Sequence, residues 1–458
     1  MNHAPNSPAA RDLAYSLHPY TNLAAHEERG PFIVTRGEGV YVYDEQGNKF
    51  VEGLSGLWCS GLGYSQDRLV AAATKQLKEL PFNHSFAHRA SVPVIELAEK
   101  LIEIAPKPLG KVYLVNSGSE AVDTAMKMVW YYHNAIGKPE KKKIISRLRA
   151  YHGVTIAAGS LTALPYAQDG WDLPIDRILH CDTPHYYRFG QDGETEEEFA
   201  TRLADALDQQ IQDEGPDTVG AFIAEPVMGA GGVMLPPKTY FEKIQKVLKK
   251  HEVLFIADEV INGFGRTGEM WGCNTYGIEP DLLTCAKQLS SAYLPIGAVM
   301  LSNKLYDAFV EQSRKLGVFG TGNTYGGHPV SAAVALETLK IYEDDDILGH
   351  VRHVSPRFMQ RLKALGNHPL VGDARGIGMI GALEIVSDKE TREQFPADKK
   401  AALTVSECIV AEKVLLRPLP GDNIGICPPL VMTEAEIDEM FDGMERGLDA
   451  AADKLGVG

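Results

Sequence analysis

The sequence predicts an α/β fold in which a large domain with a mostly parallel sheet is joined to a smaller α+β domain. Three observations lead to this prediction. Short apolar runs alternate with longer amphipathic segments, which is typical of successive strand–helix units. After about residue 330 the pattern changes to helices followed by short strands and turns. The chain has 458 residues, which is more than one hydrophobic core usually serves.

The expected elements follow in order along the chain. A strand at 40–44 runs into a turn at 46–48, and a helix at 66–80 stops before Pro81. The buried strands of the large sheet are expected at 111–115, 144–146, 219–224, 254–257 and 282–285. The remaining helices are expected at 121–134, 196–212, 240–251, 330–342 and 348–365, and the last short strands lie within 375–386 and 414–426. We expect a large domain at 65–330 and a small domain made of 1–64 plus 331–458.

Composition excludes several classes of protein. The formal net charge of −16 makes the surface a poor match for nucleic acid or an anionic membrane. The six cysteines lie far apart without a C-x-x-C pair, and His26 and His88 lack metal-ligand companions, so no metal site or disulfide scaffold is expected. The polar N-terminal segment lacks the apolar core of a signal peptide, and no charge-free stretch could span a membrane. The expected location is cytoplasmic.

The first candidate functional motif is the stretch 116–120, which follows an apolar strand and opens a long helix. Gly118 allows a sharp backbone turn, and Ser117 and Glu120 have the spacing of a capping box. The exposed N–H groups and the dipole of a helix start can bind phosphate. Many helices begin with serine and bind nothing, so this motif is informative only together with others.

Two further candidates lie where apolar strands end. Asp258 and Glu259 follow the strand at 254–257, where the carboxylate of Asp258 could keep a pyridine nitrogen protonated. The alternative is an ordinary strand end with two solvated acids. Lys287 ends the apolar run that begins at Leu282, and a desolvated lysine is a usable nucleophile and base. The alternative is a lysine whose ammonium group reaches solvent.

In this order, the motifs make the chain resemble the class III aminotransferases of the fold-type I group of pyridoxal-phosphate enzymes. The resemblance runs from about residue 22 to residue 430 and is closest to the amine–pyruvate and β-alanine–pyruvate, or ω-, branch. The matching stretches are 116–120, Tyr151-His152-Gly153, Glu225-Pro226, 258–260, 263–268, Lys287 and 324–329. The resemblance implies a fold-type I transferase with a large cofactor-binding domain.

The resemblance also implies roles for individual residues. Lys287 would hold pyridoxal 5′-phosphate as a Schiff base and move the proton between substrate and cofactor. Ser117, Gly118 and Ser119 would bind the phosphate, while Thr324 would reach the phosphate of the neighbouring subunit. The residues expected around the ring are Tyr151, His152, Glu225, Asp258 and Val260. A homodimer or a dimer of dimers, with active sites at the subunit interface, is therefore expected.

Substrate-binding residues follow from the same resemblance. Leu57, Trp58, Phe86, Tyr151 and Ala230 are expected to border the pocket, and three of them form its aromatic wall. An apolar wall suits an amine donor without a carboxylate near the reacting carbon. Arg417 would grip the carboxylate of the keto acid, although it could instead pair with nearby Asp422. Ile261 stands where many relatives that use 2-oxoglutarate have glutamine.

The expected activity is ping-pong transfer of an amino group from an amine or ω-amino acid to a keto acid, with pyruvate as the expected acceptor. The alternatives are an ω-amino-acid aminotransferase that uses 2-oxoglutarate, or an aminomutase or decarboxylase on the same fold. A regulatory protein would need an added DNA-binding domain with a basic face. A dehydrogenase would depend on the G-x-G-x-x-G pattern at 376–381, which we interpret as a glycine-rich turn because a strand and not a helix follows it.

Overall fold

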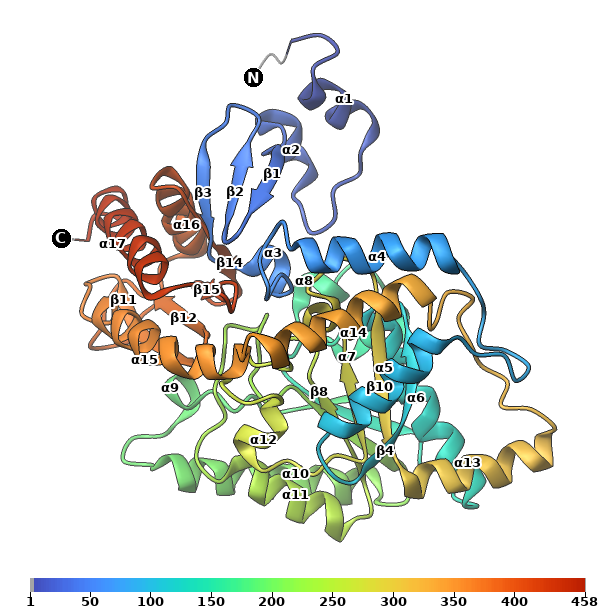
Figure 1. Cartoon of the computed structure of the whole chain (residues 1–458). Helices are drawn as coiled ribbons and strands as arrows, with labels where there is room; N and C mark the ends of the chain where they lie inside the picture. Colours follow the sequence, from blue (N-terminus) through green and yellow to red (C-terminus); the bar gives the residue numbers. More distant parts are fainter. Residues whose placement is uncertain (1–3, 458) are drawn as a thin grey trace.

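The structure, a computed structural model, describes residues 4–457 and is organised around a seven-stranded sheet (Figure 1). The strand order is β4-β10-β9-β8-β7-β5-β6. β10 runs antiparallel to both of its neighbours, and the pairs among β9, β8, β7, β5 and β6 are parallel, so the expectation of a mostly parallel sheet is confirmed. The strands are β4 (Leu109–Val115), β5 (Lys143–Arg147), β6 (Ile178–Cys181), β7 (Val219–Ala224), β8 (Leu254–Asp258), β9 (Leu282–Cys285) and β10 (Gly297–Ser302).

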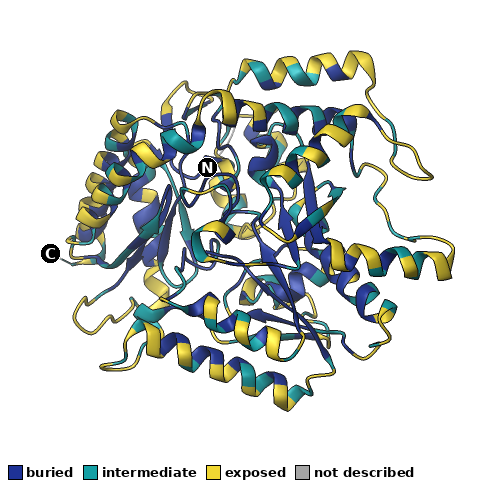
Figure 2. Cartoon of the chain, turned by 60° about the horizontal axis from the view of Figure 1, so that its bottom comes forward, coloured by how far each residue is buried: buried dark blue, intermediate teal, exposed yellow. Residues whose placement is uncertain are grey.

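Helices cover both faces of this sheet. In β7, Ala221 and Ile223 belong to one hydrophobic cluster, whereas Phe222 and Ala224 belong to another, because successive strand residues point to opposite faces. Burial is therefore nearly complete in the central strands, while the outer sides of the helices are exposed (Figure 2). The first face is covered by α6 (Gly118–Ala135), α7 (Ile156–Leu161) and α13 (Asn303–Leu316). The second face carries α5 (Val92–Ile104), α10 (Glu196–Glu214), α11 (Tyr240–Lys250) and α14 (Pro329–Asp344).

Two four-stranded sheets lie outside the large sheet, and the first of them combines segments from the beginning and the end of the chain. In the first, β3 pairs in parallel with β13, with Val51 opposite Val414. Its strands are β1 (Val34–Glu38), β2 (Tyr41–Asp44), β3 (Lys49–Glu52) and β13 (Val414–Leu415). The second contains β11 (Val371–Ile377), β12 (Ile380–Ile385), β15 (Asn423–Ile426) and β14 (Arg417–Leu419). The helices beside them are α15 (Ile347–Leu365), α16 (Ala401–Ala411) and α17 (Glu434–Leu455) (Figure 1).

The remaining helical segments are short apart from α4. They are α1 (Pro8–Tyr15), α2 (Leu23–Arg29), α3 (Ser55–Trp58), α4 (Asp67–Glu79), α8 (Pro165–Gln168), α9 (Tyr186–Phe189), α12 (Gly272–Tyr276), η1 (Lys287–Ser290) and η2 (Ala397–Lys399). The domain division at 65–330 stays a prediction, and its small-domain part at 1–64 begins with residues 1–3, which lie outside the described residues. Across residues 4–457, no helix is both long and apolar enough to cross a membrane. A cytoplasmic location also stays a prediction.

All strands and helices that the sequence predicts are present, with ends that shift by a few residues. The G-x-G-x-x-G pattern is a tight turn between antiparallel β11 and β12, where Gly378 has φ 58°, so its interpretation as a glycine-rich turn is confirmed. The sequence prediction missed the strands β1, β3, β6 and β10 and the helices α5, α13, α16 and α17. It also missed the short helices α1, α2, α3, α7, α8, α9 and α12. β6 is a four-residue edge strand of mixed burial, so it carries little periodic signal.

Candidate active site

A cavity of about 340 Å³ lies beyond the carboxyl ends of β7, β8 and β9, next to the start of α6. Ligands of open α/β sheets bind in this position because the loops that follow the strands converge there. The cavity brings together every expected cofactor-binding residue except Thr324. They are Ser117, Gly118, Ser119, Tyr151, His152, Glu225, Asp258, Val260 and Lys287.

The start of α6 forms one wall of the cavity. Ser117 is the N-cap residue, and its hydroxyl accepts a hydrogen bond from the N–H of Glu120 at 3.2 Å. The reciprocal bond of the expected capping box is displaced by one residue, because the Glu120 carboxylate accepts from the N–H of Asn116 at 2.7 Å. Gly118 does not have a positive φ. Its lack of a side chain allows close packing, because a Cβ there would lie 3.0 Å from Cγ1 of Val260. The unpaired N–H groups of this first turn suit a phosphate.

The loop 151–154 closes over the helix start. Gly153 has φ 131°, and a Cβ there would lie 2.6 Å from the hydroxyl oxygen of Ser119. The Ser119 hydroxyl in turn accepts a hydrogen bond from the N–H of Val154 at 3.1 Å. Only glycine fits this approach without strain. The loop thereby fixes Tyr151 and His152 beside the first turn of α6.

Asp258 ends β8 and is 3% exposed, so the alternative of two solvated acids is wrong. One carboxylate oxygen lies 2.7 Å from Nδ1 of His152, and the other accepts hydrogen bonds from the Thr284 hydroxyl at 3.2 Å and the Val260 N–H at 3.1 Å. These bonds fix the orientation of the carboxylate and compensate for its burial. His152 therefore acts by positioning Asp258, which the sequence did not indicate. A carboxylate held in this way is suited to keep a ring nitrogen protonated.

Lys287 lies beyond the adjacent strand β9, in which Thr284 is the register partner of Asp258. It has φ 46° and begins the 3₁₀ helix η1, a strained conformation for a residue that is not glycine. Burial lowers the pKa of the Lys287 amine, and the neighbouring Asp258 opposes that shift. Lys287 is half-buried and lines the cavity. A phosphate site, an amine and an anchored carboxylate in one cavity fit the phosphate, aldehyde and ring nitrogen of pyridoxal phosphate.

Glu225 joins two loops at the edge of the cavity. Its carboxylate oxygens accept hydrogen bonds from the N–H of Tyr151 at 3.1 Å and of Gly229 at 2.9 Å. Burial raises the pKa of Glu225, while the nearby His152 and Arg147 lower it. Glu225 thus ties the loop that carries Tyr151 to the loop that carries Gly229 at the edge of the cavity.

The expected substrate residues other than Tyr151 do not line the cavity of this chain. Trp58 is buried and packs in one cluster with Ile261, which does line it. Leu57 is 50% exposed and Ala230 is half-buried. The Arg417 guanidinium lies 5.8 Å from the ring centroid of Tyr20. Among the described residues Arg417 forms no ion pair, so the alternative of an Arg417–Asp422 pair is not realised.

Phe86 and Thr324 lie together on the surface, away from the cavity of their own chain. Phe86 is 46% exposed, and its ring packs so tightly on Gly322 that a Cβ there would lie 2.6 Å from it. Thr324 is exposed, and so is Tyr325, whose ring contacts that of Phe82 at 5.7 Å. Both residues therefore need another chain if they are to contact a substrate or cofactor.

The sequence also left some cavity residues unassigned. Ala292, Leu294, Pro295 and Ile296 line the cavity from the loop before β10, a segment without periodicity or a charged residue. Tyr20 lies near the cavity from the N-terminal segment, where its side chain is close to that of Tyr151 and its ring contacts that of Tyr166 at 5.7 Å. A lone tyrosine in a polar segment gives no signal that it will reach a site so distant in sequence.

Comparisons with known proteins agree with this geometry. A family model described as aminotransferase class-III matches residues 23–448. A probable γ-aminobutyrate transaminase 2, mitochondrial, from Oryza sativa subsp. indica is 50% identical over 441 residues, which is 96% of this chain and 88% of the relative.

Solved structures are similar over nearly the whole chain. The omega transaminase from Pseudomonas jessenii in complex with PMP has a TM-score of 0.97 and 49% identity, and covers 99% of this chain and 100% of the other. A thermostable omega transaminase variant with the substitutions W58M, F86L and R417L, engineered for asymmetric synthesis of enantiopure bulky amines, has a TM-score of 0.97 and 48% identity, and covers 98% of this chain and 100% of the other. A transaminase with L-alanine has a TM-score of 0.91 and 50% identity, and covers 92% of this chain and 100% of the other. The expected fold class is thereby confirmed.

Proposed function

This chain belongs to the class III aminotransferase family, and from that premise we propose that it transfers an amino group from an amine or ω-amino acid to pyruvate by a ping-pong mechanism. Enzymes of this family depend on pyridoxal 5′-phosphate. The observation that carries the proposal is the position of Lys287 and Asp258 at the ends of neighbouring strands, in one cavity with the start of α6.

Each residue around the cavity has a definable task. When bound, pyridoxal phosphate supplies a carbonyl carbon that takes up the amino group and a ring that withdraws electrons from the reacting carbon. Lys287 would hold the cofactor through Nζ and carry the proton to and from the substrate carbon in both half-reactions. Asp258 would keep the ring nitrogen protonated, with His152 holding the carboxylate in position. The first turn of α6 would hold the phosphate.

Pyruvate is the acceptor that the comparisons support best. A relative that is 50% identical was solved with L-alanine, which is the product that pyruvate yields when it accepts an amino group. Ile261 lines the cavity and offers no polar group for a second carboxylate. Arg417 has no ion-pair partner among the described residues and would bind the single carboxylate of the keto acid.

The amine donor is limited by the apolar surroundings of the cavity. The omega transaminase variant engineered for bulky amines is substituted at its positions 58, 86 and 417, and this chain has the same original residues at these numbers, Trp58, Phe86 and Arg417. This agreement supports those residues as substrate contacts. The γ-aminobutyrate transaminases among its relatives support an ω-amino acid as one class of donor. Aliphatic and aromatic amines without a carboxylate would fit the apolar wall equally well.

Absorption spectra of the purified protein test both half-reactions. We expect a yellow protein that bleaches when an amine donor is added and recovers its colour when pyruvate is added, because each half-reaction changes the bound cofactor. Recovery only with 2-oxoglutarate would keep the family and overturn the proposed acceptor. Donor turnover without any keto acid would instead indicate an aminomutase or decarboxylase.

Arg417→Leu separates the acceptor from the donor in this experiment. Loss of the charged hydrogen bonds is expected to raise the KM for pyruvate on the order of 10–100-fold. Bleaching by an apolar amine should be preserved, because that donor has no carboxylate for Arg417 to bind. Arg352→Leu is a matched control, since Arg352 pairs with Glu269 on the surface. An equal increase of the KM for pyruvate in both variants would contradict the role of Arg417.

We further propose that the enzyme is at least a homodimer, in which Phe86 and Thr324 of each subunit complete the active site of the other. Both residues lie on one surface and neither lines the cavity of its own chain. The same surface exposes large apolar side chains such as Phe82 and Tyr325, which are 40% and 62% exposed. Exposed apolar groups in such a patch favour association with another chain.

A mixed dimer tests whether Thr324 acts in the neighbouring subunit. A Lys287→Ala chain and a Thr324→Asp chain should each be inactive alone, because one lacks the amine and the other places a negative charge against the phosphate. In the heterodimer, the Thr324→Asp chain would keep its own Lys287 and receive an intact Thr324 from its partner. We expect about half of the wild-type activity in the purified heterodimer. An inactive heterodimer would mean that Thr324 acts within its own chain.

A further inference from the structure

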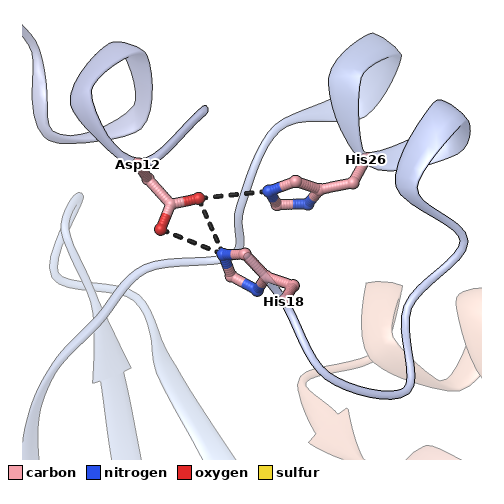
Figure 3. A group of neighbouring side chains, drawn as sticks. All are labelled: Asp12, His18 and His26. Atoms are coloured by element: carbon pink, nitrogen blue, oxygen red, sulfur yellow. Dashed lines mark hydrogen bonds and ion pairs between the residues drawn. The ribbon is translucent and has the colours of Figure 1, made fainter. Parts of the chain in front are cut away.

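Asp12, His18 and His26 converge in the N-terminal segment (Figure 3). Asp12 lies in α1, His18 follows that helix, and His26 lies in α2. Nε2 of His18 is 2.8 Å from Oδ2 of Asp12, and Nε2 of His26 is 3.1 Å from the same oxygen. The two imidazole rings lie with centroids 4.1 Å apart. The expectation that His26 has no metal-ligand companions is therefore wrong, because the loop between α1 and α2 brings them to it.

The three side chains have the donor atoms of a transition-metal site. Two imidazole nitrogens and one carboxylate oxygen lie within 4.8 Å of one another. Ligands about 2.0–2.2 Å from a zinc ion stand roughly 3.3 Å apart, so the observed spacing needs only a small expansion to admit one. The His18 side chain is 32% exposed, which leaves room for a solvent ligand.

A second cluster of a histidine and two carboxylates in the described part of the chain has an environment that disfavours a bound cation. His185, Asp373 and Glu384 also lie within 4.8 Å of one another. There Arg375 pairs with Asp373 at 2.8 Å and with Glu384 at 2.7 Å, and Arg188 also pairs with Glu384, so permanent positive charge is already present. Asp12 has no arginine or lysine partner among the described residues, and only the two histidines and the Ser16 hydroxyl face it.

We propose that Asp12, His18 and His26 form a binding site for a divalent transition-metal cation of the zinc class, with solvent as the remaining ligand. At present Nε2 of His18 and Nε2 of His26 both form hydrogen bonds with the Asp12 carboxylate. The bound ion takes the place of the protons in these two hydrogen bonds, and the protons are released. It cross-links α1 to α2 and fixes the loop between them. That loop carries Tyr20, whose side chain is close to that of the cavity residue Tyr151. Occupancy of the site therefore stabilises the segment that carries Tyr20.

Zinc binding to the holoenzyme tests the proposal. After treatment with a chelator and buffer exchange, titration calorimetry with Zn²⁺ is expected to show one equivalent bound per subunit that is absent from the double variant His18→Ala, His26→Ala. Asp12→Asn keeps a hydrogen-bond acceptor but loses the charged ligand, and it should weaken binding by more than the about 10–100-fold typical of residues that contact a metal only indirectly. Zn²⁺ should also protect the segment 16–22 of the wild type, but not of the variants, from proteolysis.

His251→Ala is the matched control. His251 lies 2.6 Å from Asp208, so it forms a histidine–carboxylate pair without a second histidine, and its loss should leave the zinc equivalent intact. The absorption of the bound cofactor verifies that each variant is folded. Absence of the equivalent from the wild type, or its retention in the double variant, would overturn the proposal and leave a hydrogen-bonded cluster only.

Discussion

Replacing Lys287 with alanine is expected to abolish transamination. The amine is the only group in the cavity that can both hold the cofactor and carry the proton, since the other titratable residues that line it are acids, a histidine and a tyrosine held by loop contacts. Proton transfer by a positioned side chain alone contributes about 10²–10⁴-fold to a rate. The loss of covalent attachment adds to that effect. Steady-state assays with an amine and pyruvate, together with the spectrum of the bound cofactor, measure it.

Lys141→Met provides a matched control for the loss of a buried lysine. Lys141 is 1% exposed, and burial lowers its pKa as it does for Lys287. Its ammonium group instead donates hydrogen bonds to the carbonyl oxygens of His251 and Glu252, at 2.8 and 3.0 Å. The variant should lose thermal stability, because two carbonyl groups lose their partner, and should keep its activity per folded subunit. Turnover by the Lys287→Ala enzyme would contradict the proposed function.

The sequence could predict those parts of the site that follow from chain order. Asp258 and Lys287 each end an apolar run, and parallel strands place such ends at one edge of a sheet. Gly118 and Ser117 mark the start of a helix that follows a strand. These predictions depend on local patterns, which a single sequence contains, and on the general rule that strand–helix–strand connections are right-handed.

Other contacts depend on how distant segments meet, and no local pattern records that. His152 reaches Asp258 only because Gly153 lets the loop lie against Ser119. Asp12 and His18 reach His26 through a loop whose spacing matches no metal-binding motif of a helix. Phe86 and Thr324 depend on association with a second chain, so even the fold of one chain does not determine which residues they contact.

Asp258→Asn is the other substitution with a large expected effect. Asparagine has nearly the same shape and can keep the hydrogen bonds from Thr284 and Val260, but it carries no charge to hold a proton on the ring nitrogen. Loss of one preorganised electrostatic contact in a buried site lowers kcat by about 10²–10³-fold. The cofactor should still bind, because Lys287 and the first turn of α6 are unchanged.

Glu259→Gln distinguishes this electrostatic role from damage to the end of β8. Glu259 is adjacent and fully buried, but its carboxylate accepts hydrogen bonds from the N–H groups of Gly272 and Cys273, at 2.9 and 2.6 Å, and it does not line the cavity. Its substitution should lower the thermal stability and change kcat little. If Asp258→Asn and Glu259→Gln lower kcat equally, the loss arises from the packing of the strand end. If only Asp258→Asn does so, the charge of Asp258 acts on the ring, because both residues are buried carboxylates at the end of β8 and only Asp258 lines the cavity.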